Sequence, residues 1–136
     1  MTSEIGVLEK LKGYFESKSN VCFASLFGSY ATGKTYAESD IDVAVYLKEG
    51  YSLESIKKVW RELEGLLERD VDLLILNTAP PLVGYAAMRG KTIVVNDYRM
   101  RLDYVLRVSQ EAEDFREFFL DLWSLRERIK ATGHIK

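Results

Sequence analysis

The sequence predicts an α/β protein, or α+β where the two classes are separated. We expect a mixed sheet of about four strands packed by helices and followed by a long C-terminal helix. Two patterns predict this class: short apolar runs alternate with stretches of helical periodicity, and one helical stretch near the end exceeds what a small sheet can cover. The length of 136 residues, with 47% apolar and 29% charged side chains, fits one folded domain.

The first half of the chain contains a helical pattern and two apolar runs. Apolar residues at helical spacing, behind two residues that can cap a helix, predict a first helix over about residues 3–18. The apolar runs 21–27 and 41–47 predict strands. Between them, residues 28–39 are polar and contain two glycines, which predicts a loop.

The middle of the chain continues with a helix and a strand. Ser52 is a good N-cap, and the apolar residues after it are spaced to share one helical face up to about Leu67. That face consists of Leu53, Ile56, Val59, Trp60, Leu63, Leu66 and Leu67. The apolar run 71–76 predicts the third strand.

The last third predicts a short helix, a strand and a long helix. Pro80-Pro81 suits a helix start and Gly90 a helix end, which predicts a short helix over about residues 82–89. The run 92–95 predicts the fourth strand. From Tyr98 to about Lys130 the pattern is helical throughout.

Charge and composition exclude several classes of function. The 19 basic and 21 acidic residues leave a net charge of −2, so we expect no direct nucleic-acid partner. The single Cys22 and single His134 exclude a disulfide framework and a Cys/His zinc cluster, and they argue against Ser-His or Cys-His catalysis. We expect no membrane association and a cytoplasmic location, since no apolar run approaches a membrane span and the N-terminus lacks an apolar signal core.

Acidic residues at the start of two predicted strands are the main candidates for chemistry. Asp40 and Asp42 point to the same face of one strand because side chains alternate, and Asp72 opens another strand. If these strands are neighbours, the three carboxylates can share a divalent cation, as in metal-assisted phosphoryl or nucleotidyl transfer. The alternative is that they are solvated strand-entry residues.

A glycine loop lies directly upstream of these acids. Read literally, residues 28–35 match the G-x-x-x-x-G-K-T pattern of a P-loop. However, too few residues remain before Asp40 for the helix that a P-loop must enter. We prefer an interpretation in which Gly28 allows a sharp turn and Ser29 binds a phosphate, with ten residues between Ser29 and Asp40. Lys34 is either a further phosphate contact or a solvated loop residue.

The combination G-S, ten residues, D-x-D, and a third aspartate on a later strand resembles the DNA-polymerase-β-like nucleotidyltransferase superfamily, and its minimal nucleotidyltransferase (MNT) branch in particular. The resemblance is sharp over residues 26–47 and 71–77. It also includes Ala31, Gly33, Ser39, Asn77 and Pro80. One residue departs from it: many relatives have an arginine where this chain has Thr32.

The resemblance implies transfer of AMP from ATP to a hydroxyl group, with one or two Mg²⁺ ions and release of pyrophosphate. It implies that Gly28 and Ser29, with Lys34, bind the nucleotide, and that Asp40, Asp42 and Asp72 hold the metal and form the catalytic set. Asp72 would also help to deprotonate the acceptor. Many MNT proteins are antitoxins that modify a tyrosine of a cognate HEPN-domain toxin, which would make this chain part of a hetero-oligomer.

The proposed division of the chain is a nucleotidyltransferase core over residues 1–97 and a C-terminal helical segment over residues 98–136. The outer apolar residues Phe118, Phe119 and Trp123 either cover the core or bind a partner. Two other functions stay open: an antitoxin that neutralises by binding alone, and a nucleotidyltransferase for a small molecule. A P-loop NTPase is a more distant alternative.

Overall fold

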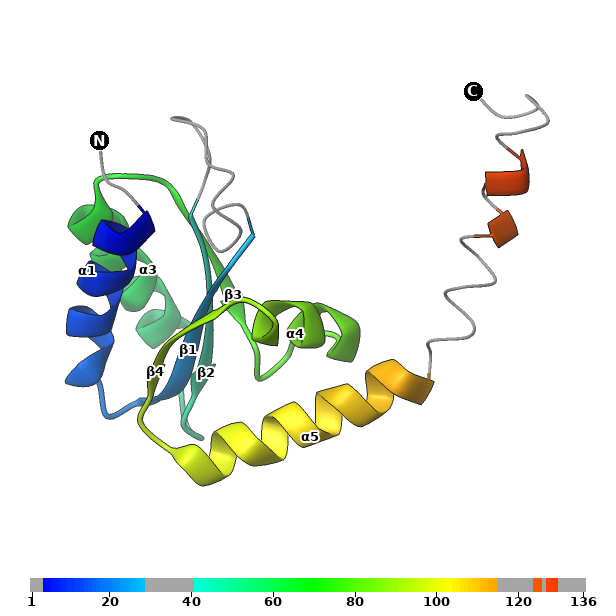
Figure 1. Cartoon of the computed structure of the whole chain (residues 1–136). Coiled ribbons are helices and arrows are strands. Elements are labelled where there is room, and N and C mark those ends of the chain that lie inside the picture. The colour runs from blue at the N-terminus through cyan, green and yellow to red at the C-terminus, as the bar shows by residue number, and fades with distance from the viewer. Residues whose placement is uncertain (1–3, 29–40, 115–123, 126, 130–136) are drawn as a thin grey trace.

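The computed structural model describes residues 4–28, 41–114, 124–125 and 127–129 (Figure 1). Its elements follow the predicted order, and most bounds agree with the prediction to within two residues. They are α1 (Glu4–Glu16), β1 (Val21–Phe27), β2 (Ile41–Leu47), α3 (Leu53–Leu67), β3 (Val71–Ile75), α4 (Pro81–Met88), β4 (Lys91–Val95) and α5 (Tyr98–Asp114). The predicted long C-terminal helix is described as far as Asp114, and the predicted docking residues 118, 119 and 123 lie outside the described residues.

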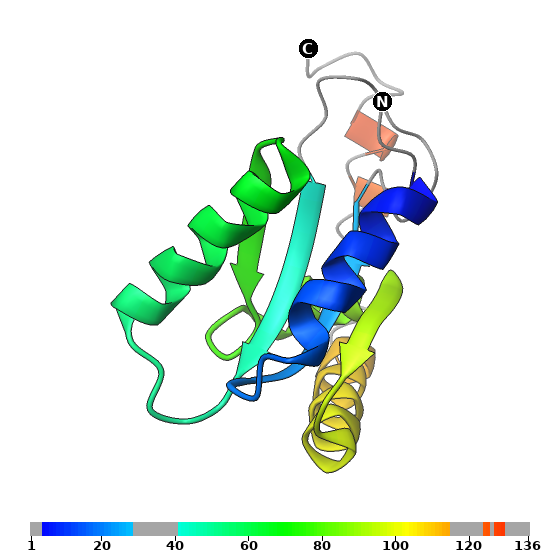
Figure 2. The same cartoon turned by 90° about the vertical axis from the view of Figure 1, so that its left-hand side faces the viewer.

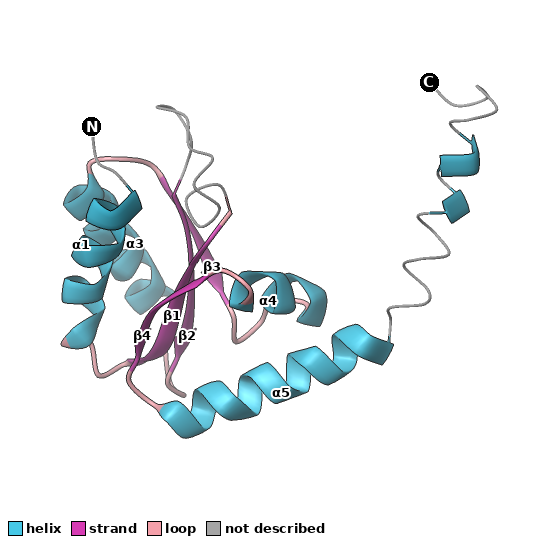
Figure 3. Cartoon of the chain, in the orientation of Figure 1, coloured by secondary structure: helices cyan, strands magenta, loops and turns pink. Residues whose placement is uncertain are grey.

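The strands form one mixed sheet in the order β3-β2-β1-β4, which confirms the predicted fold class (Figure 3). β1 runs antiparallel to both β2 and β4, whereas β2 and β3 are parallel and are connected through α3. A P-loop joins its strand through a helix, and such crossovers connect parallel strands. Because β1 and β2 are antiparallel, with Phe27 opposite Asp42, the P-loop interpretation does not fit this topology.

Helices cover both faces of the sheet. Figures 1 and 2 show α1 and α3 on one face and α4 and α5 on the other. The core of the first face contains Leu11 and Phe15 of α1 together with alternate residues of β2, such as Val43. The core of the second face contains Phe23 and Tyr104 and is smaller. Within β2 the apolar residues of the larger core alternate with residues that face α4 and α5, and Asp42 belongs to this second set.

The N-terminus of α3 is capped as the sequence predicts, but its buried face is narrower. The Ser52 side chain accepts a hydrogen bond from the backbone N–H of Ser55, and the Ser55 hydroxyl accepts one from the Ser52 N–H. The predicted apolar face is wrong at Leu53, which is 64% exposed, and Trp60 is also partly exposed. The sheet buries Val59, Leu63 and Leu67 of this face, and Ile56 and Leu66 are partly buried against the same core.

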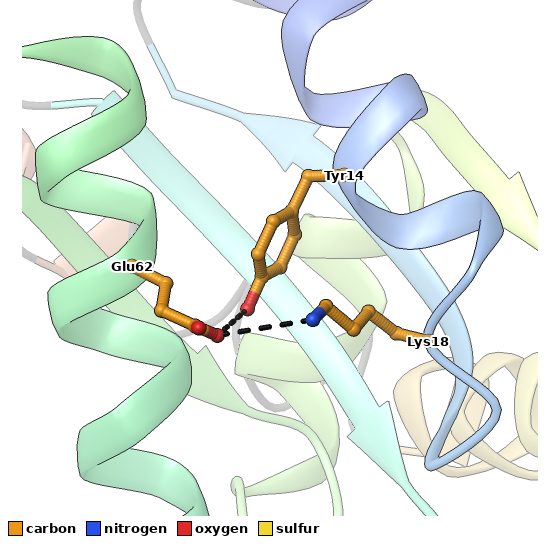
Figure 4. Close-up of polar contacts among 3 residues, drawn as sticks. All are labelled: Tyr14, Lys18 and Glu62. Atoms are coloured by element: carbon orange, nitrogen blue, oxygen red, sulfur yellow. Dashed lines mark hydrogen bonds and ion pairs between the residues drawn. The ribbon is translucent and has the colours of Figure 1, made fainter.

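A polar contact joins α1 to α3 (Figure 4). The Tyr14 hydroxyl donates a hydrogen bond of 2.6 Å to Glu62 Oε1, and Lys18 Nζ lies 3.9 Å from the same oxygen. Burial and the neighbouring carboxylate both raise the pKa of Tyr14, while the hydrogen bond from Tyr14 lowers the pKa of Glu62. The contact fixes the two helices relative to each other on this face of the sheet.

The other face shows a close helix contact and an exposed stripe. A Cβ added at Gly84 of α4 would overlap the hydroxyl of Tyr104, so glycine at this position lets the Tyr104 side chain pack directly against α4. The residues of α5 that are buried are Tyr104 and Val108, whereas Leu102 and Leu106, which helped to predict this helix, are exposed.

Within the described residues, no helix combines the length and apolarity needed to cross a membrane.

Candidate active site

Two of the predicted aspartates lie side by side on neighbouring strands. Asp42 of β2 and Asp72 of β3 are register partners in the parallel pair. Adjacent strands are about 4.8 Å apart, and partners at one register level project to the same face. The structure therefore brings together the two carboxylates that the sequence assigned to separate strands, at the end of the sheet where β2 and β3 begin.

The repulsion between the Asp42 and Asp72 carboxylates depends on how far each is exposed to water. The Asp42 side chain is half-buried and Asp72 is exposed. Like charges on register partners of adjacent strands repel each other, and the repulsion is stronger where water is partly excluded. A divalent cation between them would turn this repulsion into attraction, since carboxylate oxygens are the ligands that Mg²⁺ prefers.

Gly28 completes the described part of the site. It directly follows β1, which runs antiparallel to β2, so the end of β1 meets the start of β2 at Phe27 and Asp42. Gly28 has φ +73°, and a Cβ added there would overlap Oδ2 of Asp42. Its backbone thus lies directly against the Asp42 carboxylate, in a conformation that favours glycine. This agrees with the predicted sharp turn at Gly28.

Two further residues hold the end of β1 in place. Ser25 is buried, and its single O–H is shared between the carbonyl oxygens of Ala87 at 3.0 Å and Lys91 at 3.1 Å. Gly90, predicted as a helix end, follows the C-cap Arg89, and a Cβ added to it would overlap the carbonyl oxygen of Leu26. Strand β1 is therefore anchored to α4 and β4 immediately before it delivers Gly28 to the site.

The remaining predicted site residues lie outside the described part of the chain. These are Asp40, Ser29 and Lys34, together with Thr32, where many relatives have arginine. Among the described residues, no group of three His, Cys, Asp or Glu side chains is placed to hold a metal ion. The third predicted ligand, Asp40, is not among them.

Ser25 and Asn77 support the strands around the site, and neither role follows from local sequence patterns. Ser25 lies within the apolar run 21–27, and its hydroxyl is the one polar side chain in that predicted strand. Asn77 entered only through the family resemblance. Its side chain accepts from the backbone N–H of Leu47 and donates to the Leu47 carbonyl, each at 2.8 Å, which ties the segment after β3 to the end of β2.

The described residues fit a divalent cation next to a phosphate chain. Asp42 and Asp72 offer oxygen ligands from two adjacent strands, and the absence of a side chain at Gly28 lets its backbone lie directly against the Asp42 carboxylate. A metal held by one or two carboxylates and completed by substrate phosphates is the usual arrangement for Mg²⁺ in phosphoryl-transfer sites.

Comparison with known proteins identifies the family. Residues 9–99 match the family model described as "Polymerase beta, Nucleotidyltransferase". A protein of Methanocaldococcus jannaschii that is provisionally named a protein adenylyltransferase is 42% identical over 66 residues, which cover 48% of this chain and 71% of that protein.

Solved structures agree with the fold. A crystal structure of a toxin–antitoxin with AMP-PNP aligns with a TM-score of 0.66 and 20% identity, covering 85% of this chain and 98% of that chain. A complex of a tri-AMPylated Shewanella oneidensis HEPN toxin with an MNT antitoxin aligns with a TM-score of 0.59 and 17% identity, covering 85% and 98%. At these identities the similarity supports the architecture described above.

Proposed function

The chain belongs to the polymerase beta nucleotidyltransferase family, and on that premise we propose that it is a Mg²⁺-dependent adenylyltransferase that transfers AMP from ATP to a hydroxyl group of a partner protein. The observation that carries the proposal is the in-register pair of Asp42 and Asp72 beside the backbone of Gly28. The name of the Methanocaldococcus relative and the AMP-PNP of the structural neighbour support adenosine as the nucleoside.

Each residue has a distinct task in this proposal. The acceptor oxygen forms a bond to the α-phosphorus of ATP while the bond from that phosphorus to the β-phosphate oxygen breaks, and pyrophosphate leaves. Asp42, with Asp40, would hold Mg²⁺, which neutralises the developing charge on the phosphates when bound. Asp72 would share the metal and accept the proton of the attacking hydroxyl. Gly28 would let the triphosphate approach closely, with Ser29 and Lys34 as further contacts.

A protein acceptor is supported by a surface on α5. Tyr98, Leu102 and Leu106 are spaced four residues apart, share one side of the helix, and are 77%, 57% and 59% exposed. Large apolar side chains in a row are typical of protein interfaces. Structural neighbours are antitoxins in complexes with HEPN toxins, so we propose a HEPN-domain toxin, modified on a tyrosine, as the partner in a cytoplasmic hetero-oligomer.

The proposed function gives different roles to two parts of the chain. The family match ends at residue 99, and α5 begins at Tyr98. We propose that residues 1–97 form the nucleotidyltransferase core, and that residues 98–136 belong to the same domain and bind the partner.

Radiolabelled ATP, purified partner toxin and Mg²⁺ provide the test. Asp42→Asn and Asp72→Asn should each lower label transfer by at least about 10²-fold, because the neutral amide weakens metal binding and cannot accept a proton. Both variants should still bind the partner, whereas Leu102→Asp with Leu106→Asp should weaken that binding. Unchanged transfer in both asparagine variants would exclude the proposed mechanism.

Two alternatives give different results in the same experiment. If the asparagine variants neutralise the toxin as fully as the wild type does, the chain acts by binding alone. If label appears on an aminoglycoside or another small hydroxyl compound and not on the protein, the acceptor is a small molecule.

A further inference from the structure

Strand β3, which carries Asp72, is held by two side chains of α3 at its outer edge. In the described sheet β3 has β2 on one side, and the Asp70 carbonyl accepts from the Ile41 N–H across that side. The backbone groups of Val71 are instead bound by α3. Trp60 Nε1 donates to the Val71 carbonyl at 2.7 Å, and the Val71 N–H donates to Glu64 Oε2 at 3.0 Å.

The geometry of α3 explains why both groups of one residue are bound. Trp60 and Glu64 are four residues apart, so they lie on the same side of the helix, one turn from each other. Figure 2 shows α3 beside the β3 edge of the sheet. Outward-facing groups of an edge strand are ordinarily left to water. Here the N–H and the C=O of Val71 have fixed protein partners, and the bond to the Glu64 carboxylate is of the stronger, charge-assisted kind.

This contact acts on Asp72 through the backbone. The Val71 carbonyl lies in the same planar peptide unit as the Asp72 nitrogen, so the bond from Trp60 fixes the orientation of that plane. The Asp72 side chain is exposed and is the second residue of its strand, so packing does little to hold it. The backbone that carries Asp72 determines the direction of its Cα–Cβ bond, and therefore the region that the carboxylate can reach.

We propose that Trp60 and Glu64 are positioning residues for Asp72: by holding both backbone groups of Val71, they aim the Asp72 carboxylate at the shared metal position beside Asp42. The inference rests on the proposed function, in which Asp72 is a metal ligand. A displacement of about 1 Å at a reacting group can cost about 10²-fold in rate. Loss of a residue that orients a metal ligand typically costs 10–100-fold in metal affinity or activity.

The test compares variants that remove one hydrogen bond each. Trp60→Phe keeps an aromatic ring but lacks the N–H, and Glu64→Ala removes the acceptor. With α,β-methylene-ATP present, both should bind Mg²⁺ about tenfold more weakly than the wild type by calorimetry, and the Asp72 amide should exchange faster. Transfer from ATP should fall by a similar factor. Glu64→Gln retains an acceptor oxygen and should restore Mg²⁺ affinity to within about twofold of the wild type.

Tyr14→Phe is the matched control, since it breaks a different side-chain bond to α3, the one at Glu62. It should lower the melting temperature without changing Mg²⁺ affinity. The inference is overturned if Trp60→Phe and Glu64→Ala bind Mg²⁺ as the wild type does, or if Tyr14→Phe weakens Mg²⁺ binding as much as they do. Asp72→Asn distinguishes a failure of the proposed function from a failure of this inference alone. If Asp72→Asn binds Mg²⁺ with wild-type affinity, Asp72 is not a metal ligand. The role of Asp72 in the proposed function and the present inference are then both refuted. Weak binding in Asp72→Asn but not in the α3 variants refutes the inference alone.

Discussion

Substituting Gly28 by alanine tests the contact between the end of β1 and the Asp42 carboxylate. The new Cβ meets two obstacles. The residue has φ +73°, where a Cβ approaches the following carbonyl, and the Cβ would occupy the position of Asp42 Oδ2. The flexible carboxylate can move aside, but then it leaves the position opposite Asp72.

The two obstacles differ in magnitude and in readout. A non-glycine residue with this backbone conformation costs about 1–2 kcal/mol of folding free energy. In a domain of this size the melting temperature should then fall by about 3–8 °C. Movement of the Asp42 oxygen by about 1 Å affects chemistry far more than stability, and transfer activity should fall by about 10²-fold.

Gly50→Ala is the control that separates these effects. Gly50 has φ +89°, and a Cβ added there has open space around it. It should therefore show the loss of stability without the loss of activity. We would measure thermal unfolding, Mg²⁺ affinity and transfer rate for both variants. The reasoning is refuted if Gly28→Ala and Gly50→Ala have the same transfer rate and Mg²⁺ affinity.

Three predictions concern stability. The buried Tyr104 hydroxyl has no hydrogen-bond partner among the described residues, so Tyr104→Phe should stabilise the fold by about 1 kcal/mol in urea unfolding; destabilisation would contradict this. Ser25→Ala removes a buried hydroxyl that serves two carbonyls and should destabilise by about 1–3 kcal/mol in the same assay. The pKa of Glu62 is lowered below 4.5 in the folded state, chiefly by the bond from Tyr14, so its stabilising contribution is present above that pH and is lost on acidification. The melting-temperature difference between wild type and Tyr14→Phe should therefore shrink between pH 6 and pH 3, and a constant difference would show that the hydrogen bond is not pH-coupled.

Local patterns were sufficient to predict most of the elements and to place the candidate ligands Asp42 and Asp72 on strands. The bounds of β1 and β2 agree with the apolar runs because strand formation here follows from short stretches bounded by glycine, polar and acidic residues. That Asp42 faces away from the larger core follows from strand alternation alone. Cys22, which lies in the predicted strand 21–27, is a buried residue of β1.

Only the tertiary structure decided which segments meet. The parallel pairing that sets Asp72 opposite Asp42, the approach of Gly28 to Asp42, and the hold of α3 on Val71 all join residues distant in sequence. The same applies to the helices, where the pattern included Leu53 and Leu102 on apolar faces that the narrow sheet does not cover. Periodicity shows that a face is apolar, but burial depends on which partner is present and how wide it is. The sequence by itself therefore determined the elements and the candidate ligands, and packing between the described elements decided that Gly28, Asp42 and Asp72 lie together.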